Sequence, residues 1–360
     1  MNGRERMLTA LNRGIPDRVP HWELAYNESS IINIARHFTK DVPEIDFIQR
    51  MDLETKVKLF DTVVMVVNEL DIDGLTLRPF SSTTFIDDER FVDDWGVTFQ
   101  VHPAGESVVL DGPVSCEDDL KSYKPPTIQE SDLLALNYAA DQLNNEKGIV
   151  LSLQCPFRRS WNMVGGMTNL LIAYMTNSNF AHKLARIATD FTKETIELGV
   201  KLGAHIISLD GDLAHNTNTI ISPQHFREFL KPYYTELVDF THGLGLPIFK
   251  HTDGDHSKIT EDLLETGLDG IHPIQPQCLD IGKVKKEIGD RICIIGNIDC
   301  IETLVSKNTT DVEEEVRRTI KIAAPGGGYI LSSSNSIHPG VKSENYIAMV
   351  QAAHKYGTYD

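Results

Sequence analysis

Hydrophobic positions along the chain fall into two patterns, short continuous runs and longer stretches with an apolar residue every three to four positions. Near-continuous apolar runs are typical of strands that helices cover on both faces. The runs predict eight strands, at 18–24, 74–77, 149–154, 205–209, 247–250, 270–274, 292–296 and 329–332. The longer stretches predict helices at 179–202, 222–243, 258–266, 311–324 and 343–356.

This alternation predicts an α/β protein and, more specifically, a (β/α)8 barrel. A doubly wound sheet is the alternative, but it would leave two of the strands surplus. Residues 79–147 are rich in Asp, Pro and Ser and interrupt the pattern, with a small hairpin or excursion expected at 85–101 and 107–110. We interpret them as an insertion between the second and third strands, so that residues 1–360 form one barrel domain. Ser222-Pro223 is typical of a helix start, and Gly243 and Gly267 of helix ends.

Composition and charge narrow the classes of function. The chain is 41% hydrophobic and 24% charged, as in an ordinary globular protein, and its formal net charge is −18. This sign disfavours binding to nucleic acid and to anionic membrane surfaces. The sequence has neither an apolar run long enough to span a bilayer nor a signal-peptide pattern at its start. The five cysteines form no CxxC pair, so we predict a cytoplasmic protein without a disulfide framework.

Polar residues gather where the predicted strands end, which is where barrels of this kind carry their active sites. The candidates for substrate binding are Trp22, Glu23, Tyr26, Asn216 and Asn335. Trp22 and Tyr26, together with Phe157 and Trp161, could also form apolar walls, although core packing explains these aromatic residues equally well.

The pair His251-Thr-Asp253 follows the fifth strand. Histidine and aspartate two positions apart at a strand end point the same way, and both bind divalent metals such as zinc. A third ligand could come from Glu23, Asp210, Asp212 or Asn335. In the alternative interpretation, Asp253 caps the next helix and His251 only forms a hydrogen bond in the barrel mouth.

Asp210 and Asp212 follow the fourth strand and are candidate catalytic groups together with His251. Two carboxylates in one barrel mouth raise the pKa of one of them, which suits a general acid or base. A turn or helix cap is the alternative, since Asp-Gly is a common turn pair. Arg158 and Arg159 could clamp a carboxylate or be solvated surface residues.

Several segments together resemble the uroporphyrinogen decarboxylase superfamily over nearly the whole chain. They read RERMLTALNRGIPDRVPHWE, DDWGVTF, GPVSCEDDLKSYKPP, SPQHFREFLKPYY, FKHTDGD, IIGNID and GGGYILSSSNSIHPGVKSENYIAMVQAA. The resemblance implies a (β/α)8 barrel with its active site at the carboxyl ends of the strands. The decarboxylase proper binds its tetrapyrrole through an arginine-rich N-terminal motif, but this chain has no arginine between Arg18 and Arg36. Decarboxylation of uroporphyrinogen is therefore not expected.

The other branch of the superfamily contains corrinoid-dependent methyltransferases. The coenzyme M methyltransferases hold zinc with His-x-Cys after strand five and a cysteine after strand eight. The corresponding positions here are His251-Thr-Asp253 and Asn335. Oxygen ligands make a harder site than thiolates, which argues against activation of a thiol.

The chain is also similar to the methyltransferase components of O-demethylase systems. This similarity implies transfer of a methyl group from a small donor, an aromatic methyl ether, to a corrinoid (cobalamin) carried by a partner protein. Metal at His251 and Asp253, or a proton from Asp210 or Asp212, could stabilise the leaving phenolate. A lyase acting on a carboxylate and a non-catalytic binding barrel remain alternatives. Related barrels often pair, which leaves a homodimer open.

Overall fold

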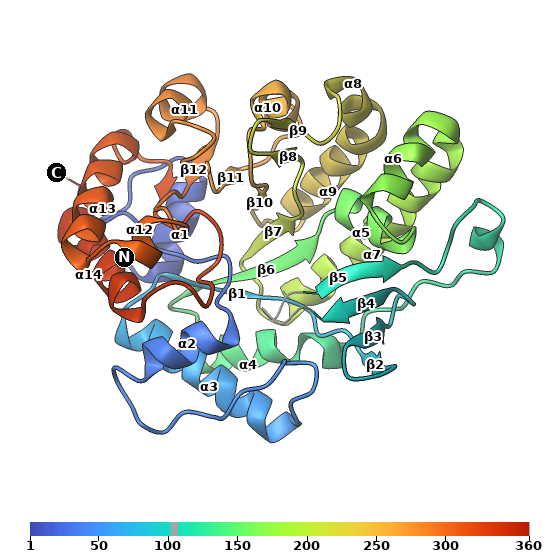
Figure 1. Ribbon diagram of the computed structural model, residues 1–360. Coiled ribbons are helices and arrows are strands. Elements are labelled where there is room, and N and C mark those ends of the chain that lie inside the picture. Colours follow the sequence, from blue (N-terminus) through green and yellow to red (C-terminus); the bar gives the residue numbers. More distant parts are fainter. Residues whose placement is uncertain (102–106, 360) are drawn as a thin grey trace.

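The core of the protein is a curled parallel sheet surrounded by helices (Figure 1), and this confirms the predicted (β/α)8 barrel. The computed structural model describes residues 1–101 and 107–359. Within them the sheet has seven strands, in the order β1 (Gly74–Leu77), β6 (Gly148–Gln154), β7 (Ile206–Asp210), β10 (Ile248–His251), β11 (Gly270–His272), β12 (Cys293–Ile295) and β13 (Tyr329–Ile330). All neighbouring pairs are parallel. Each strand lies within a few residues of its predicted position.

The eighth position is occupied by an irregular segment, so the prediction of a strand at 18–24 is wrong. This segment forms only isolated bridges, including one between His21 and Leu331. The backbone N–H of Asp73 donates to the carbonyl oxygen of His21 at 3.0 Å, and that of Leu331 to Pro20 at 2.9 Å. Pro20 has no N–H to contribute to a ladder, which explains why no regular strand forms. The segment nevertheless links both edges of the sheet and closes the barrel.

The helices that cover the barrel follow the predicted pattern in its second half. The prediction at 179–202 corresponds to α7 (Ser178–Lys201), and 343–356 matches α14 (Ser343–Tyr356). The remaining α-helices are α1 (Gly3–Leu11), α2 (Glu28–Ala35), α3 (Leu53–Glu69), α4 (Leu134–Gln142), α5 (Pro156–Met163), α6 (Met167–Thr176), α8 (Pro223–His225), α9 (Lys231–Gly243), α10 (Thr260–Leu264), α11 (Ile281–Ile288), α12 (Thr303–Ser306) and α13 (Thr309–Ala323). Short 3-10 turns are η1 (Asp119–Lys121), η2 (Glu130–Leu133) and η4 (Ser257–Ile259).

The predicted helix 222–243 is divided into three parts. Ser222 caps its start as expected, because its hydroxyl accepts a hydrogen bond from the backbone N–H of His225 at 3.1 Å. A π-helical turn, η3 (Phe226–Leu230), then separates α8 from α9. Pro232, in the first turn of α9, cannot donate to a carbonyl of the preceding turn, so the regular α-helical ladder is interrupted there.

The insertion between β1 and β6 forms a four-stranded antiparallel sheet beside the barrel (Figure 1), which is more regular structure than the small hairpin or excursion predicted there. Its strands are β2 (Thr83–Phe85), β3 (Arg90–Asp93), β4 (Thr98–Val101) and β5 (Ser107–Asp111). Phe91 and Phe99 stack across β3 and β4 with ring centroids 5.2 Å apart. Residues 102–106, which the predicted insertion also includes, lie outside the described residues. The loop after β7 adds a small hairpin, β8 (Ala214–His215) and β9 (Asn218–Thr219).

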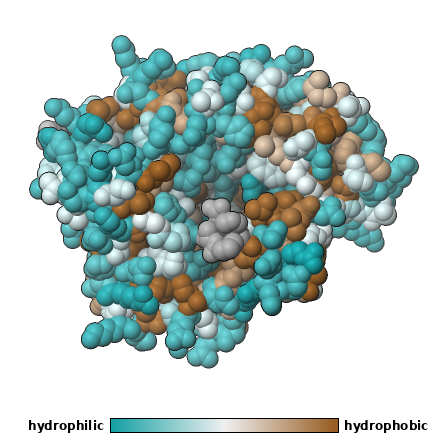
Figure 2. Space-filling model, in the orientation of Figure 1, coloured by the Kyte–Doolittle hydropathy of each residue, from teal (hydrophilic) through white to brown (hydrophobic). Residues whose placement is uncertain are grey.

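Most of the surface in Figure 2 is hydrophilic, with apolar residues in small groups. Across residues 1–101 and 107–359, no helix combines the length and the hydrophobicity needed to cross a membrane.

A buried carboxylate holds the amino-terminal end of the barrel together. The Asp73 side chain is 0% exposed and accepts hydrogen bonds from Arg6 at 3.1 Å, from Arg18 at 2.7 Å and from the backbone N–H of His21 at 2.9 Å. Asp73 directly precedes β1, so this cluster ties helix α1 and the closing segment to the sheet.

We expect Asp73→Ala to lower the free energy of unfolding by about 3 kcal/mol or more, because two arginines would lose their buried counter-charge. Urea denaturation measures this change. Asp71→Asn is the matched control, because asparagine tolerates the φ of +46° at this position. Asp71 also pairs with Arg18 and with Lys147 but is 59% exposed, so the loss of its charge should cost less than about 1 kcal/mol. Equal effects of the two substitutions would contradict this account.

Candidate functional site

One histidine and three carboxylates meet where β7 and β10 end. Asp210 ends β7 and His251 ends β10, with Asp212 and Asp253 two residues beyond each strand. The Nε2 atom of His251 lies 3.8 Å from the Oδ1 atoms of three aspartates, Asp210, Asp212 and Asp253. The structure therefore brings together all the predicted catalytic and metal-binding residues.

The two loops hold each other in place. The backbone N–H of Asp253 donates to Oδ1 of Asp212 at 3.0 Å, and that of Leu213 donates to the hydroxyl of Thr252 at 2.8 Å. Gly254 has a φ of +84°, and a Cβ atom there would lie 2.4 Å from the carbonyl oxygen of His215. Only glycine allows this close approach without strain, so the spacing of the carboxylates depends on the backbone of both loops.

The carboxylates differ in their electrostatic environment. Burial is the largest single effect on Asp210 and opposes its ionisation. The nearby positive charges, of which Arg78 at 3.0 Å contributes most, together outweigh burial and lower the pKa of Asp210 to about 2. Burial raises the pKa of Asp253 to about 6, against the opposing effect of His251 and with a further contribution from the charge of Asp212. The sequence predicted a raised pKa at Asp210 or Asp212. For Asp210 this is wrong, because Arg78 neutralises it.

Asp253 has one oxygen that is available for a ligand. Its Oδ2 accepts a hydrogen bond from the side-chain amide of Asn335. Its Oδ1 is buried and has no hydrogen-bond partner among residues 1–101 and 107–359. A buried oxygen without a partner is costly in a protein unless a proton or an ion satisfies it.

The geometry of this group fits a divalent metal ion. Single ligand atoms of Asp212, His251 and Asp253 all lie within 4.8 Å of one another. Two ligands that bind zinc at its usual bond lengths and a tetrahedral angle lie roughly 3.4 Å apart, close to the 3.8 Å found between His251 and each carboxylate. Imidazole and carboxylate are both established zinc ligands, so the donor set also agrees.

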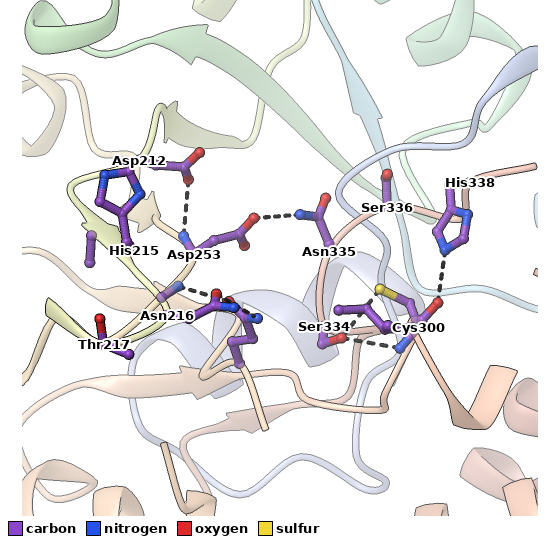
Figure 3. Close-up of a pocket in the computed structure, with 14 residues that line it drawn as sticks. Asp212, His215, Asn216, Thr217, Asp253, Cys300, Ser334, Asn335, Ser336 and His338 are labelled. Carbon is purple, nitrogen blue, oxygen red and sulfur yellow. Dashed lines mark hydrogen bonds between the residues drawn. The ribbon is translucent and has the colours of Figure 1, made fainter. Parts of the chain in front are cut away.

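A cavity of about 640 Å³ opens beside this group. Figure 3 shows Asp212 and Asp253 on one side, with Cys300, Ser334 and His338 across from them. Asn216 and Asn335, both predicted to bind substrate, line the cavity. The whole lining is Asp212, Ala214, His215, Asn216, Thr217, Asp253, Gly254, Gln275, Cys300, Ile301, Ser334, Asn335, Ser336 and His338. This volume suits a small-molecule substrate.

The other three predicted substrate-binding residues lie away from this cavity. Trp22 is 0% exposed and packs edge-on against Phe249. Glu23 is 1% exposed and lies in the barrel interior. The hydroxyl of Tyr26 forms a hydrogen bond with that of Tyr346 at 2.6 Å. The closing segment thus directs these side chains into packing and hydrogen-bond contacts of their own, and none of them lines the cavity.

Two further sequence signals have structural roles. Asp255, not Asp253, stabilises the turn after β10, because its carboxylate accepts a hydrogen bond from the backbone N–H of Ser257 at 3.0 Å. The guanidinium group of Arg158 lies 4.6 Å from the ring centroid of Trp161, and that of Arg159 lies 4.1 Å from the ring centroid of Trp95. Both arginines therefore stack on aromatic rings.

Two residues near His251 have no predicted role in the sequence. Arg78 directly follows β1, so its position at a strand end was a usable signal. His272 ends β11, and its Nδ1 atom lies 2.8 Å from Nδ1 of His251. Burial lowers the pKa of His272 well below its usual value, and the charge of His251 adds to this effect.

We expect zinc affinity to fall as the pH is lowered through 6. A pKa raised to about 6 means that Asp253 keeps its proton up to that pH, and zinc must displace this proton. Above the pKa this cost vanishes, and below it the affinity decreases by up to about tenfold per pH unit. Calorimetric titration with zinc between about pH 5 and 7.5 measures the dependence. An affinity that stays constant over this range would contradict the raised pKa.

Comparison with known proteins places this barrel among its relatives. A family model described as uroporphyrinogen decarboxylase (URO-D) matches residues 2–356. The chain is 23% identical to a uroporphyrinogen decarboxylase of Alkalilimnicola ehrlichii, over 98% of this chain and 93% of that protein. It is 24% identical to the methylcobamide:CoM methyltransferase MtaA of Methanosarcina barkeri, over 69% of this chain and 68% of that protein.

Among solved structures, a methyltransferase from Methanosarcina mazei superposes with a TM-score of 0.76 at 18% identity, covering 99% of both chains. This likeness shows that the two proteins share their fold. Because the family model covers almost the entire sequence, the chain belongs to the uroporphyrinogen decarboxylase family.

Proposed function

We propose that the protein transfers a methyl group from a small methylated donor, an aromatic methyl ether, to the cobalt of a corrinoid carried by a separate protein. The observation that carries this proposal is the group of Asp212, His251 and Asp253, with an unpartnered carboxylate oxygen, beside a cavity of about 640 Å³. The similarity to the methyltransferase MtaA, whose name specifies a methylcobamide as methyl donor, supports a corrinoid as one of the two substrates, with the direction of transfer reversed here.

The reaction requires help at the leaving oxygen. The electron pair of Co(I) forms the new bond to the methyl carbon, and the pair of the broken C–O bond stays on the ether oxygen, which becomes a phenolate. Zinc bound by Asp212, His251 and Asp253 would supply Lewis-acid stabilisation of this charge. In this chain, Asn335 orients Asp253 by a hydrogen bond, and Arg78 offsets the charge of Asp210.

The experiment is methylation of Co(I) cobalamin by the zinc-loaded protein, followed by absorption spectroscopy over a panel of methoxybenzenes with different ring substituents. We expect the Co(I) spectrum to convert to that of methyl-Co(III) for at least one donor, and chelation of zinc to slow the conversion. If no donor gives methyl-cobalt with zinc-loaded protein, the proposal is wrong.

Decarboxylation of a small carboxylate is a second candidate, favoured by the similarity to a decarboxylase along 98% of the chain. It predicts release of carbon dioxide without any corrinoid. The same protein preparation, incubated with carboxylates in the absence of cobalamin, separates the two functions.

A further inference from the structure

A chain of hydrogen bonds runs from His251 into the barrel interior, away from the cavity. It starts at the Nδ1 atom of His251, 2.8 Å from Nδ1 of His272. The other nitrogen of His272, Nε2, lies 3.2 Å from the hydroxyl of Ser332 and 3.3 Å from the carbonyl oxygen of Ser333. Both histidines are buried, His272 completely.

Glu23 anchors the far end of this chain. It accepts hydrogen bonds from the Ser332 hydroxyl at 3.4 Å, from the backbone N–H of Ser333 at 3.2 Å and from Nε2 of His21 at 3.0 Å. The hydroxyl of Ser333 also donates to it. Because the single hydroxyl hydrogen of Ser332 is directed at Glu23, the Ser332 oxygen can only accept from His272.

These partners determine which nitrogens carry hydrogen. The Ser333 carbonyl and the Ser332 oxygen are both acceptors, so Nε2 of His272 must donate. Only one hydrogen fits between the two Nδ1 atoms. If it belonged to His272, that ring would carry a positive charge at a fully buried position, which is costly. The hydrogen therefore belongs to Nδ1 of His251, and when this ring is neutral its Nε2 keeps a lone pair directed toward the three carboxylates.

We infer that His272 is a positioning residue that fixes the tautomer of His251, with Ser332, Ser333 and Glu23 holding His272 in turn. The bare Nε2 of His251 is then ready to bind a metal ion without any rearrangement. Partners of this kind, behind a ligating histidine, orient the ring and raise its affinity for metal. The catalytic meaning of this inference rests on the proposed function, but the tautomer itself does not. It also gives the buried Glu23 a role that the sequence, which placed it against the substrate, did not reveal.

The test is the two-bond nitrogen–proton spectrum of the metal-free protein with 15N-labelled histidine, recorded above the usual titration range of histidine. His251→Gln identifies the resonances of His251. We expect hydrogen on Nδ1 and a bare Nε2 in the wild-type protein. In His272→Phe, which lacks an acceptor, we expect a shift toward the form with hydrogen on Nε2. His272→Asn should keep the wild-type pattern, because its amide oxygen can accept from Nδ1 of His251.

Hydrogen on Nε2 of His251 in the wild-type protein would overturn the inference, and so would an unchanged pattern in folded His272→Phe. If circular dichroism shows that the Phe variant does not fold, the wild-type spectrum and the spectrum of His272→Asn still test the tautomer of His251. As a second readout, zinc affinity should fall about 10- to 100-fold in His272→Phe and less in His272→Asn. Absence of methyl transfer with the predicted tautomer intact would contradict the proposed function alone.

Discussion

His251→Gln is expected to abolish zinc binding and to lower kcat/KM for methyl transfer by about 1000-fold, because metal stabilisation of a leaving oxygen is worth several kcal/mol. His251 is the only group that lies 3.8 Å from all three carboxylates in the part of the chain described here. A glutamine amide is a weak ligand for zinc. The substitution also removes the imidazole group that lies next to all three carboxylates. Metal analysis and the methyl-cobalt assay measure the two effects.

The matched control is His242→Gln. His242 pairs with Asp269 at 2.8 Å and is 42% exposed, at the end of α9. This substitution should leave both zinc content and activity unchanged. If His251→Gln behaved like His242→Gln, the metal and the reaction would not depend on this group.

Asp253→Asn is expected to abolish activity while stabilising the metal-free protein. Burial raises the pKa of Asp253 to about 6, so the folded state disfavours its charge, and an uncharged amide removes that penalty. The gain should be about 1–3 kcal/mol near pH 8. The amide can still accept the hydrogen bond from Asn335 through its oxygen, but it provides no anionic ligand. Gains of stability on removal of a functional charge are common at active sites.

The pH dependence of this gain has a definite sign. Protonated Asp253 favours the folded state, and this contribution is complete below the unfolded pKa of 3.8 and lost as the pH rises through about 6. The advantage of Asp253→Asn should therefore be large near pH 8, roughly half as large near pH 5 and small near about pH 3 in chelator-treated protein. Urea denaturation at these pH values measures it. Asp255→Asn is the control and should give no such gain, because hydrogen bonding to Ser257 lowers the pKa of Asp255. A variant less stable than wild type at pH 8 would contradict the raised pKa.

Most strands of the barrel were predictable from continuous hydrophobic runs, because strands that are buried on both faces carry apolar side chains on both faces. The first strand position is different, because Pro20 cannot donate to a ladder and its neighbours Arg18 and His21 form only isolated bridges. No helix is predicted at α3, whose run Val63, Val64, Val66 and Val67 has the β-branched composition of a strand. Packing of the helix against its neighbours overrides this local preference.

The candidate site was predictable in its ligands but not in its surroundings. The pattern His-x-Asp and the Asp-Gly-Asp loop both follow buried strands, and parallel strands bring their ends together. By contrast, nothing in the local sequence distinguishes Glu23, which is turned toward Ser333, from a residue that faces the cavity. Partners such as Arg78 and Asp210 are 132 positions apart in sequence, so their ion pair emerges only from the fold.

The most direct test of the central claim is the zinc stoichiometry of the wild-type protein after reconstitution and removal of excess metal. We predict one zinc per chain in wild type and in Asp210→Asn, whose carboxylate is already paired with Arg78. We predict none in Asp212→Asn or Asp253→Asn. A wild-type protein that retains no zinc, or retains it equally in all four proteins, would contradict a metal centre formed by Asp212, His251 and Asp253.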